Sequence, residues 1–506
     1  MAHAIEMIDI CKYFPGVQAN DHITLQVQDG EIHGLLGENG AGKSTLMNIL
    51  FGLYQPNSGA IRVKGTEVVM DTPRKAIDLG IAMIHQHFML IKTLTVAENI
   101  ILGEEPSNSL KILNNAAIHA EVADLLEQIG FHLDPNALIE DISVGLQQRV
   151  EILKALYRKA KILILDEPTA VLTPQEADEL FGTIRKLKKQ GTTIIFITHK
   201  LREIMAICDR VTILRHGKVA GVVNIAETTT PELASLMVGR EVLFRLEKVK
   251  QECGDVVLEA NNLSAVDDRN IQALDGISFC ANAGEIVGIA GVQGNGQTEL
   301  VEVLTGLRDI QDGMVTINGV STVGFSPREI LKTGVAHIPE DRQKRGLITS
   351  FSIRENMILG LHYTPGFSKF AILDNERIEE FSNECIKAFE IKLADIGSPI
   401  STMSGGNQQK VILARELLGR NPKVIIASQP TRGLDVGVIE YVHQTLLRMR
   451  EQKKAILLVS TELDEIRALA DRAYVMFKGK IMAEVDPKTI SDQDISLLMA
   501  GITLDN

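Results

Sequence analysis

The chain has 506 residues, 45% hydrophobic and 23% charged, which is long enough for more than one globular domain with a buried core. Its formal net charge of -13 argues against nucleic acid as the main partner, because nucleic-acid binding depends on clustered lysine and arginine. No apolar stretch approaches the roughly 18 to 20 residues of a transmembrane helix, and residues 1–10 lack the features of a signal peptide, so we expect a cytosolic protein. The five cysteines form no C-x-x-C pair, so we expect free thiols.

Near the start of the chain, Phe14 lies in the aromatic stretch Lys12-Tyr13-Phe14-Pro15, ahead of a glycine-rich segment. A ring at this place is suited to stack on a flat ligand such as a nucleobase. Packing in the hydrophobic core explains an aromatic residue equally well. Both interpretations stay open.

The glycine-rich segment, residues 37–44, matches the pattern G-x-x-x-x-G-K-[ST]. Residues 32–36 before it are predicted to form a strand and residues 45–51 after it a helix, which argues against a chance glycine-rich turn. In such a loop backbone N–H groups point at phosphate, Lys43 reaches the β- and γ-phosphates, and Ser44 offers its hydroxyl to Mg²⁺. We predict a nucleoside triphosphate site formed by Gly37, Glu38, Asn39, Gly40, Ala41, Gly42, Lys43, Ser44 and Thr45.

Two adjacent acids follow a later apolar run, residues 161–165, which is predicted to be a buried strand. In a parallel sheet, ligands bind beyond the carboxyl ends of the strands, where Asp166 and Glu167 emerge. Asp166 suits the Mg²⁺ shell, and Glu167 suits a general base for an attacking water. An acidic turn that only caps the strand is the alternative, and the phosphate loop upstream argues against it.

Two further predicted strands also end in polar residues. Residues 81–84 are followed by Gln86 between two histidines, and because no third metal ligand is apparent, Gln86 is preferred as the functional residue. Residues 193–197 are followed by His199, for which we predict a contact to the γ-phosphate. A structural glutamine and a structural histidine are the alternatives.

The second half of the chain repeats the first, since the glycine-rich segment that begins at Gly37 returns at Gly291, at a spacing of 291 - 37 = 254. Three more pairs keep the same order: residues 143–148 with 404–409, 166–169 with 428–431, and 236–239 with 498–501. We therefore predict two homologous domains, residues 1–240 and 255–506, joined by a short charged linker of residues 241–254.

The phosphate loop, Gln86, the Ser-x-Gly-x-x-Gln stretch before the acid pair and His199 together resemble an ABC-type ATPase, the energising subunit of ATP-driven transporters. The resemblance covers nearly all of both halves and is closest to the fused double ATPases of bacterial sugar and nucleoside importers. Residues 289–298, 338–342 and 168–174 favour the nucleoside branch. The implied fold class is α/β, with two tandem nucleotide-binding domains, each a parallel-sheet core with an antiparallel β subdomain and a helical subdomain.

The resemblance also implies two ATP molecules sandwiched between the halves, each held by one half's phosphate loop and the other half's Ser-Gly-Gly signature. The first half keeps Lys43, Gln86, Asp166, Glu167 and His199, but has Val144 in its signature and Thr173 in a later turn. The second half has Gln297, Glu340, Ser428, Gln429 and Thr461 at the hydrolytic positions, yet keeps Ser404, Gly405, Gly406 and Asp435. We expect one hydrolytic composite site and one site that binds nucleotide weakly or statically.

As a member of this family the chain is expected to use ATP and Mg²⁺, with Ser44, Gln86 and Asp166 around the metal. Implied partners are two integral-membrane permease subunits, reached through Gln86, and an extracytoplasmic solute-binding protein or lipoprotein, at the cytoplasmic face of the inner membrane. The implied solute is a nucleoside, with a ribose- or galactose-type sugar as the alternative. A soluble twin ATPase acting on ribosomes or DNA is the alternative of another class, and the short linker and negative charge argue against it.

Overall fold

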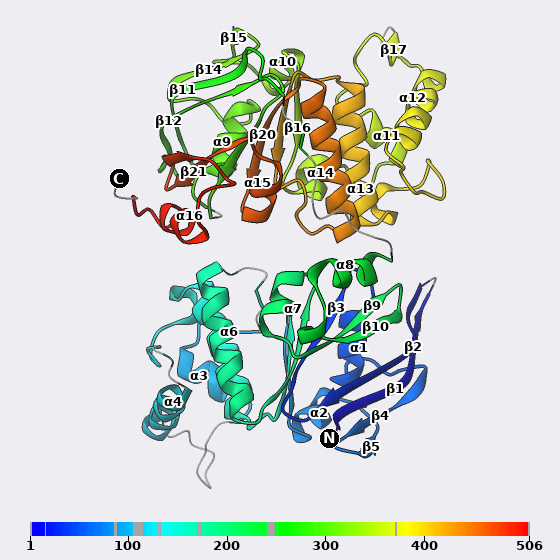
Figure 1. Ribbon diagram of the computed structural model, residues 1–506, viewed down its shortest axis with the longest axis vertical. Coiled ribbons are helices and arrows are strands. Elements are labelled where there is room, and N and C mark those ends of the chain that lie inside the picture. The colour runs from blue at the N-terminus through cyan, green and yellow to red at the C-terminus, as the bar shows by residue number, and fades with distance from the viewer. Residues whose placement is uncertain are drawn as a thin grey trace. The chain divides into compact units, whose positions relative to one another are not determined.

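The computed structural model describes residues 3–15, 17–85, 89–104, 115–129, 131, 133–169, 172, 174–239, 248–249, 251–292, 294–369 and 372–503. The chain divides into two units, Met1–Val242 (unit 1) and Leu243–Asn506 (unit 2), each with its own sheets and helices (Figure 1). Among the described residues, no helix has both the length and the apolar character needed to cross a membrane.

Unit 1 is built on a six-stranded sheet in the order β10-β9-β3-β8-β7-β6, in which only the edge pair β9 and β10 is antiparallel. β3, β7 and β8 are buried along their whole length, which explains why these strands are continuous apolar runs. The strands are β3 (Ile32–Gly37), β6 (Ile81–Ile84), β7 (Ile162–Asp166), β8 (Thr193–Thr198), β9 (Arg210–Arg215) and β10 (Lys218–Asn224).

A four-stranded antiparallel sheet covers one face of this core, in the order β2-β1-β4-β5. Its strands are β1 (His3–Phe14), β2 (Val17–Gln28), β4 (Ser58–Val63) and β5 (Thr66–Val68). Helix α1 (Lys43–Leu50) packs between the two sheets, since Leu46 and Leu50 share one apolar cluster with Met7 of β1 and Ile195 of β8. The phosphate loop is thus held between two sheets.

The other helices of unit 1 are α2 (Pro73–Asp78), α3 (Val96–Ile101), α4 (Asn115–Ile129), α5 (Val144–Tyr157), α6 (Pro174–Lys189), α7 (Leu201–Ile207) and α8 (Thr230–Val238), with 3₁₀ turns η1 (Ile139–Asp141) and η2 (Ile225–Glu227). Helices α3, α4 and α5 form a helical region around a separate core that includes Val96, Val122 and Val150. This core lies away from both sheets, so the apolar side chains of the three helices cover one another there.

Unit 2 repeats this topology. Its six-stranded sheet has the order β16-β19-β20-β13-β21-β22, and its antiparallel sheet the order β12-β11-β14-β15. The strands are β11 (Val256–Val266), β12 (Gln272–Asn282), β13 (Ile286–Ala290), β14 (Asp312–Ile317), β15 (Val320–Ser321), β16 (Val335–Ile338), β19 (Val424–Ser428), β20 (Ala455–Ser460), β21 (Arg472–Phe477) and β22 (Lys480–Val485), with a hairpin of β17 (Ser368–Lys369) and β18 (Ile372–Leu373). The predicted α/β class with antiparallel and helical subdomains is confirmed in both halves.

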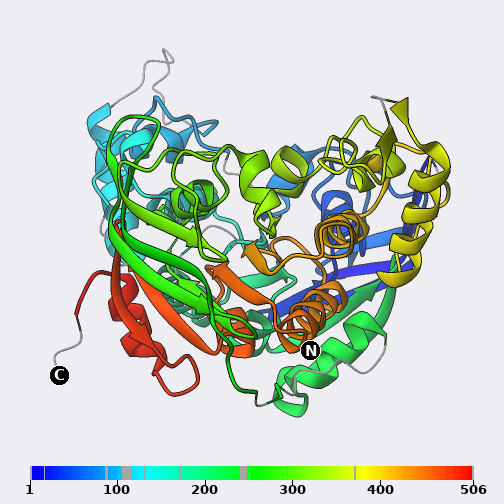
Figure 2. The same cartoon turned by 90° about the horizontal axis from the view of Figure 1, so that it is seen from above.

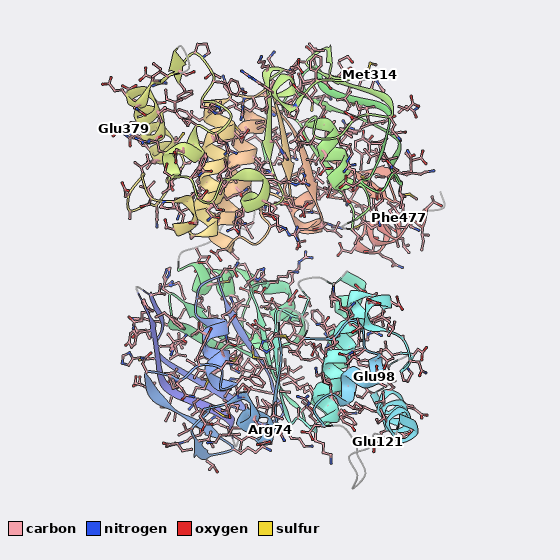
Figure 3. All side chains as sticks on the ribbon, turned by 180° about the vertical axis from the view of Figure 1, so that it is seen from behind. Arg74, Glu98, Glu121, Met314, Glu379 and Phe477 are labelled. Atoms are coloured by element: carbon pink, nitrogen blue, oxygen red, sulfur yellow. The ribbon has the colours of Figure 1, made fainter. Side chains whose placement is uncertain are left out.

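The helices of unit 2 are α9 (Gln297–Leu304), α10 (Pro327–Lys332), α11 (Ile353–Met357), α12 (Asn375–Ala388), α13 (Gly405–Leu413), α14 (Val436–Glu451), α15 (Leu463–Leu469) and α16 (Asp492–Met499), with the 3₁₀ turn η4 (Ile400–Thr402) and the π-helical segments η3 (Arg342–Gly346) and η5 (Ala414–Gly419). Helices α13 and α14 lie side by side (Figures 1 and 2) and pack with Ile425 of β19. The next residue, Ile426, joins the opposite core, as the two-residue period of a strand requires. Charged side chains such as Glu121 of α4 and Glu379 of α12 lie on the outside (Figure 3).

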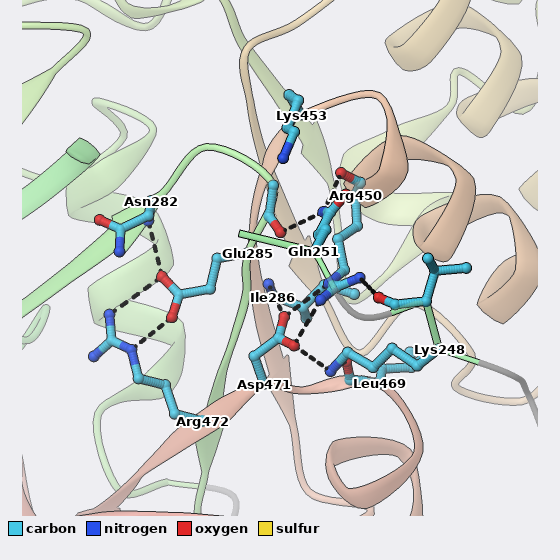
Figure 4. Close-up of polar contacts among 12 residues, drawn as sticks. Lys248, Gln251, Asn282, Glu285, Ile286, Arg450, Lys453, Leu469, Asp471 and Arg472 are labelled. Atoms are coloured by element: carbon cyan, nitrogen blue, oxygen red, sulfur yellow. Dashed lines mark hydrogen bonds and ion pairs between the residues drawn. The ribbon is translucent and has the colours of Figure 1, made fainter. Parts of the chain in front are cut away.

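Residues 248–249 and 251–254, inside the predicted linker, belong to unit 2 and contact later parts of it (Figure 4). Lys248 Nζ lies 2.7 Å from Asp471 Oδ1, and Gln251 donates to the backbone oxygens of Gly284 and Arg450 at 2.7 and 2.9 Å. Arg450 in turn binds both carboxylate oxygens of Asp471, at 2.9 and 3.0 Å. These contacts hold the residues before β11 against the end of α14 and the amino ends of the inner strands β13 and β21.

Candidate active site

The phosphate loop of unit 1 joins β3 to α1, as predicted. Gly42, the residue before α1, has φ 97°, and a Cβ on it would collide with the backbone oxygen of Ala19, so only glycine fits. The buried Lys43 Nζ donates to the backbone oxygens of Gly37 and Glu38 at 2.7 and 3.0 Å. The lysine therefore lies along the loop, at the amino end of α1, where an anion is stabilised.

The acid pair and the histidine meet beyond the carboxyl ends of β7 and β8. Asp166 is the buried last residue of β7, and Glu167 follows with φ 47°, held by a hydrogen bond from its N–H to the oxygen of Ile197 at 2.9 Å. This left-handed backbone aims the Glu167 carboxylate at His199, whose Nδ1 lies 2.8 Å from Glu167 Oε1. The sequence placed these residues at one sheet edge, and the structure brings them into contact.

The pKa values of the two acids are shifted in opposite directions. Burial, together with the neighbouring Glu167 charge, raises the pKa of Asp166, while the Ser44 hydroxyl and Lys43 partly offset this. Burial acts in the same direction on Glu167, but hydrogen bonding to His199 and the charges of His199 and Lys43 outweigh it and lower the pKa of Glu167. Glu167 is thus ionised and partnered near neutral pH, which suits an acceptor for a proton from water.

The sequence analysis did not predict the polar groups that support these residues. Glu203 of α7 accepts from the Thr198 hydroxyl at 2.8 Å and from the Thr169 hydroxyl, so it links the turn after β7 to the end of β8. Gln148 of α5 donates to the oxygen of Pro168 at 2.5 Å. The internal repeat is the signal that reveals them, because unit 2 has the same bonds between Thr431 and Glu465 at 2.8 Å and between Gln409 and Pro430 at 2.9 Å.

Phe14 is 37% exposed at the end of β1, so it does not pack in the core. Its ring meets that of Tyr54 edge to face with centroids 5.6 Å apart, and Lys12 Nζ lies 5.3 Å from the Phe14 centroid. In the next strand, Asn20 donates to the oxygen of Gly42 at 3.1 Å, which ties this aromatic end to the phosphate loop. The ring is thus partly exposed beside Tyr54, and its contact with a nucleobase stays a prediction.

Some predicted residues fall outside the described part of the chain. Gln86 and Thr173 are among these, and so is the side chain of Val144. Ser143, before Val144, accepts a hydrogen bond from the N–H of Leu146 at 3.4 Å and begins α5. The remaining predicted residues of unit 1 lie in the loop or at the strand ends described above.

Unit 2 keeps the loop geometry and changes its chemistry. Gly296, before α9, has φ 103°, close to the 97° of Gly42, and Gly294 has φ 91° against 81° for Gly40. Gln297 replaces the lysine and is 7% exposed, with neither amide atom in a hydrogen bond to a described residue. The loop still presents N–H groups to an anion, but it carries no cation.

At the strand ends of unit 2, too, the backbone geometry is kept while the side chains differ. Gln429 has φ 45° and donates its N–H to the oxygen of Val459 at 2.8 Å, which reproduces the backbone of Glu167. Thr461 donates to Gln429 Oε1 at 3.3 Å, where unit 1 has a histidine and a carboxylate. Ser428 is buried at the position that corresponds to Asp166, and Glu340 is paired with Arg432. Unit 2 thus keeps the backbone of the two strand ends but has no acidic side chain at the positions of Asp166 and Glu167.

The signature residues lie together at the amino end of α13. Ser404 caps this helix, and its hydroxyl accepts from the backbone N–H and side-chain amide of Asn407 at 3.4 and 3.1 Å. A Cβ on Gly406 would lie 2.6 Å from Val438 of α14, so the glycine permits close packing of the two helices. Asp435 is the residue before α14. Gly405 and Gly406 therefore present backbone N–H groups at a helix start.

Comparisons with known proteins agree with this geometry. The family model described as ABC transporter matches residues 20–170 and 274–432. The chain is 52% identical to a guanosine import ATP-binding protein of Bacillus subtilis, over 99% of this chain and 98% of the relative, and 48% identical to a nucleoside import ATP-binding protein of Lactococcus lactis, over 98% of each. It is 39% identical to a ribose import ATP-binding protein of Bacillus subtilis, over 98% of this chain and 99% of the relative.

Proposed function

The chain belongs to the ABC transporter family, and from this premise we propose that it hydrolyses ATP to drive uptake of a nucleoside through a membrane permease. The observation that carries the ATPase proposal is the contact between Glu167 and His199 beside the phosphate loop. The nucleoside proposal rests on relatives at 52% and 48% identity that are named for guanosine and nucleoside import. Ribose is the second candidate because a ribose import relative is 39% identical.

In the proposed reaction, water attacks the γ-phosphate in line and Glu167 accepts its proton. His199 holds the Glu167 carboxylate and contacts the γ-phosphate, while Lys43 turns from the loop oxygens to the β- and γ-phosphates. Ser44 and Asp166 fit Mg²⁺, because a hydroxyl and a carboxylate interact there and hard cations prefer oxygen ligands. When bound, Mg²⁺ neutralises charge on the phosphates.

We also propose that the two units differ in function. Unit 2 has no base at Gln429 and no lysine at Gln297, so its loop holds nucleotide without hydrolysis. Ser404, Gly405, Gly406 and Asp435 are proposed to contact the nucleotide that unit 1 hydrolyses. In support, all hydrolytic groups occur in unit 1 and the intact Ser-Gly-Gly signature in unit 2.

As partners we propose two integral-membrane permease subunits, with Gln86 as the relay to them, and an extracytoplasmic solute-binding protein or lipoprotein. The chain would lie at the cytoplasmic face of the cell membrane. The names of the import relatives support a membrane permease partner for this chain. The solute-binding protein follows from the family resemblance.

Uptake by whole cells tests the proposal. Cells of the source organism that lack the chain are complemented with the parent or with Glu167→Gln, and uptake of labelled guanosine and labelled ribose is measured. We expect the parent to restore guanosine uptake and the variant to fail at equal expression. Restored ribose uptake alone would replace the nucleoside by a sugar, and restoration by Glu167→Gln would contradict the ATPase proposal.

A further inference from the structure

Three side chains that can ligate a metal meet in unit 1, where β1 pairs with β2. Cys11 belongs to β1, and Asp21 and His22 belong to β2. The sulfur of Cys11, a carboxylate oxygen of Asp21 and a ring nitrogen of His22 all lie within 4.8 Å of one another. The proposed ATP hydrolysis uses none of these side chains, so the reaction at the phosphate loop does not account for this group.

A β-bulge brings the three residues together. Asp21 and His22 both lie opposite Cys11, because the register of the two strands shifts at this place. His22 has φ 52°, and its N–H donates to Cys11 Sγ at 3.3 Å. Its ring nitrogen Nδ1 lies 2.8 Å from Asp21 Oδ1. The bulge thus collects a sulfur, an oxygen and a nitrogen from residues that are up to 11 positions apart in the sequence.

The corresponding bulge of unit 2 shows that the fold requires neither a cysteine nor a histidine here. Ser264 and Gly276 occupy the positions of Cys11 and His22, and the N–H of Gly276 donates to the Ser264 hydroxyl at 3.1 Å. Gly276 has φ 67°, which glycine adopts freely and which strains a residue that carries a Cβ. Unit 1 therefore has a strained backbone at the residue that supplies the imidazole.

An ion pair between an aspartate and a lysine occurs at both bulges. Asp21 Oδ2 lies 3.0 Å from Lys218 Nζ, and Asp275 Oδ2 lies 3.0 Å from Lys480 Nζ. In unit 1 the lysine contacts Oδ2, whereas Oδ1 is the oxygen beside His22. The Asp21 carboxylate can therefore keep its ion pair through one oxygen and ligate a metal through the other.

We propose that Cys11, Asp21 and His22 bind one Zn²⁺ ion, with water as the fourth ligand. Thiolate, imidazole and carboxylate are the groups that bind zinc in proteins, whereas Mg²⁺ prefers oxygen ligands alone. A tetrahedral zinc ion holds its ligand atoms about 3 to 4 Å apart. The side chain of His22 is exposed, so it can move the remaining distance without disturbing the core. The ion cross-links β1 and β2 next to Asn20, which connects β2 to the phosphate loop.

The test measures Zn²⁺ binding to the nucleotide-free full chain, in excess Mg²⁺ and in competition with a chromophoric chelator. Cys11→Ser and His22→Gly each introduce the residue that unit 2 has at its bulge, so both variants should fold. We expect each to weaken Zn²⁺ binding about 100-fold or more, because the loss of a mere outer-shell partner costs roughly 10- to 100-fold. Cys253→Ser removes an exposed thiol and is the matched control, which should bind Zn²⁺ as the parent does.

Co²⁺ in place of Zn²⁺ identifies the sulfur ligand. A cobalt ion bound to a thiolate has a sulfur-to-metal charge-transfer band in the near ultraviolet. We expect this band in the parent and in Cys253→Ser, and its loss in Cys11→Ser. The proposal is overturned if the parent binds no Zn²⁺, if Cys11→Ser and His22→Gly bind it as tightly as the parent, or if the cobalt band survives in Cys11→Ser.

Discussion

At the scale of single residues, the bond between Glu167 and His199 determines how the base behaves with pH. His199 lowers the pKa of Glu167 against the effect of burial, so the carboxylate stays ionised to a lower pH than an isolated buried acid. Removing the histidine should raise the pKa of Glu167. The acid limb of the rate profile should move with it, because a protonated carboxyl accepts no proton.

We therefore predict that His199→Ala moves the acid limb of kcat/KM for ATP to higher pH, in addition to lowering the rate. The measurement is an ATPase pH profile of parent and variant between pH 5 and 9. Thr198→Ser, which keeps the hydroxyl that Glu203 accepts, is the control and should keep the parent profile. An unshifted limb in His199→Ala would contradict the electrostatic coupling.

The loop of unit 2 gives a second prediction at this scale. Since Gly296 keeps the backbone of Gly42 and Gln297 occupies the place of the lysine, Gln297→Lys should restore a cation without disturbing the loop. We expect nucleotide to bind unit 2 about 10-fold more tightly, the scale of one charged hydrogen bond, with no new hydrolysis because Gln429 and Ser428 remain. Binding stoichiometry on the Glu167→Gln chain measures this. No gain in affinity would mean that the loop of unit 2 does not bind phosphate.

The sequence predicted where single residues lie in the fold wherever a local pattern fixes the position. The loop residues and the strand ends are set by runs of glycine and apolar residues, so Lys43, Asp166 and His199 were predictable. The contact of Glu203 with Thr169 and Thr198 was not, because it depends on how α7 packs beside two strand ends.

At the scale of elements, Asp471 binds Lys248 directly and Val249 through Arg450, which connects these residues to later parts of unit 2. Burial raises the pKa of this carboxyl, but hydrogen bonds from Arg450, from the N–H of Ile286 and from Lys248 outweigh burial and lower it. A carboxyl with a depressed pKa stabilises the fold above its unfolded pKa of about 3.9, and this stabilisation is lost as the pH falls through the folded value.

We predict that Asp471→Asn costs about 2 kcal/mol of unfolding free energy at pH 7, the scale of charged hydrogen bonds lost in a partly buried network. The difference from the parent should begin to shrink below the unfolded pKa of about 3.9, because there the unfolded chain takes up a proton while the folded carboxyl, with its lower pKa, is still ionised. Denaturant unfolding at pH 7 and pH 3.5 measures both values, with Asp486→Asn as a surface control. A difference that is equal at both pH values would exclude ionised Asp471 as the cause.

A helix or strand was predictable from the sequence where its apolar residues line one face or where all of its residues are apolar. The buried runs of β3, β7 and β8 were found this way. The antiparallel sheet followed only from family resemblance, because its register shifts and long twisted strands interrupt the two-residue period. The contacts of Val249 and Gln251 with Arg450 had no local signal, since these partners lie 201 and 199 residues apart in the sequence.

At the scale of the whole molecule, the two units share one fold, and we propose that only one of them carries the hydrolytic residues in working form. Both units have the same strand order and the same backbone at the hydrolytic position, with φ 47° at Glu167 and φ 45° at Gln429. Only unit 1 combines a lysine, an acid pair and a histidine at its site. The central claim is that one of the two sites supplies all of the ATP hydrolysis.

The most direct test compares the ATPase rates of Glu167→Gln and Gln429→Glu in the purified full chain with its permease partners. The two changes exchange the same amide and carboxylate at equivalent backbone positions, so each serves as the control for the other. We predict that Glu167→Gln lowers kcat by about 10²-fold or more, the scale of a general base, and that Gln429→Glu leaves it nearly unchanged. Equal losses in both variants, or full activity in Glu167→Gln, would contradict the account.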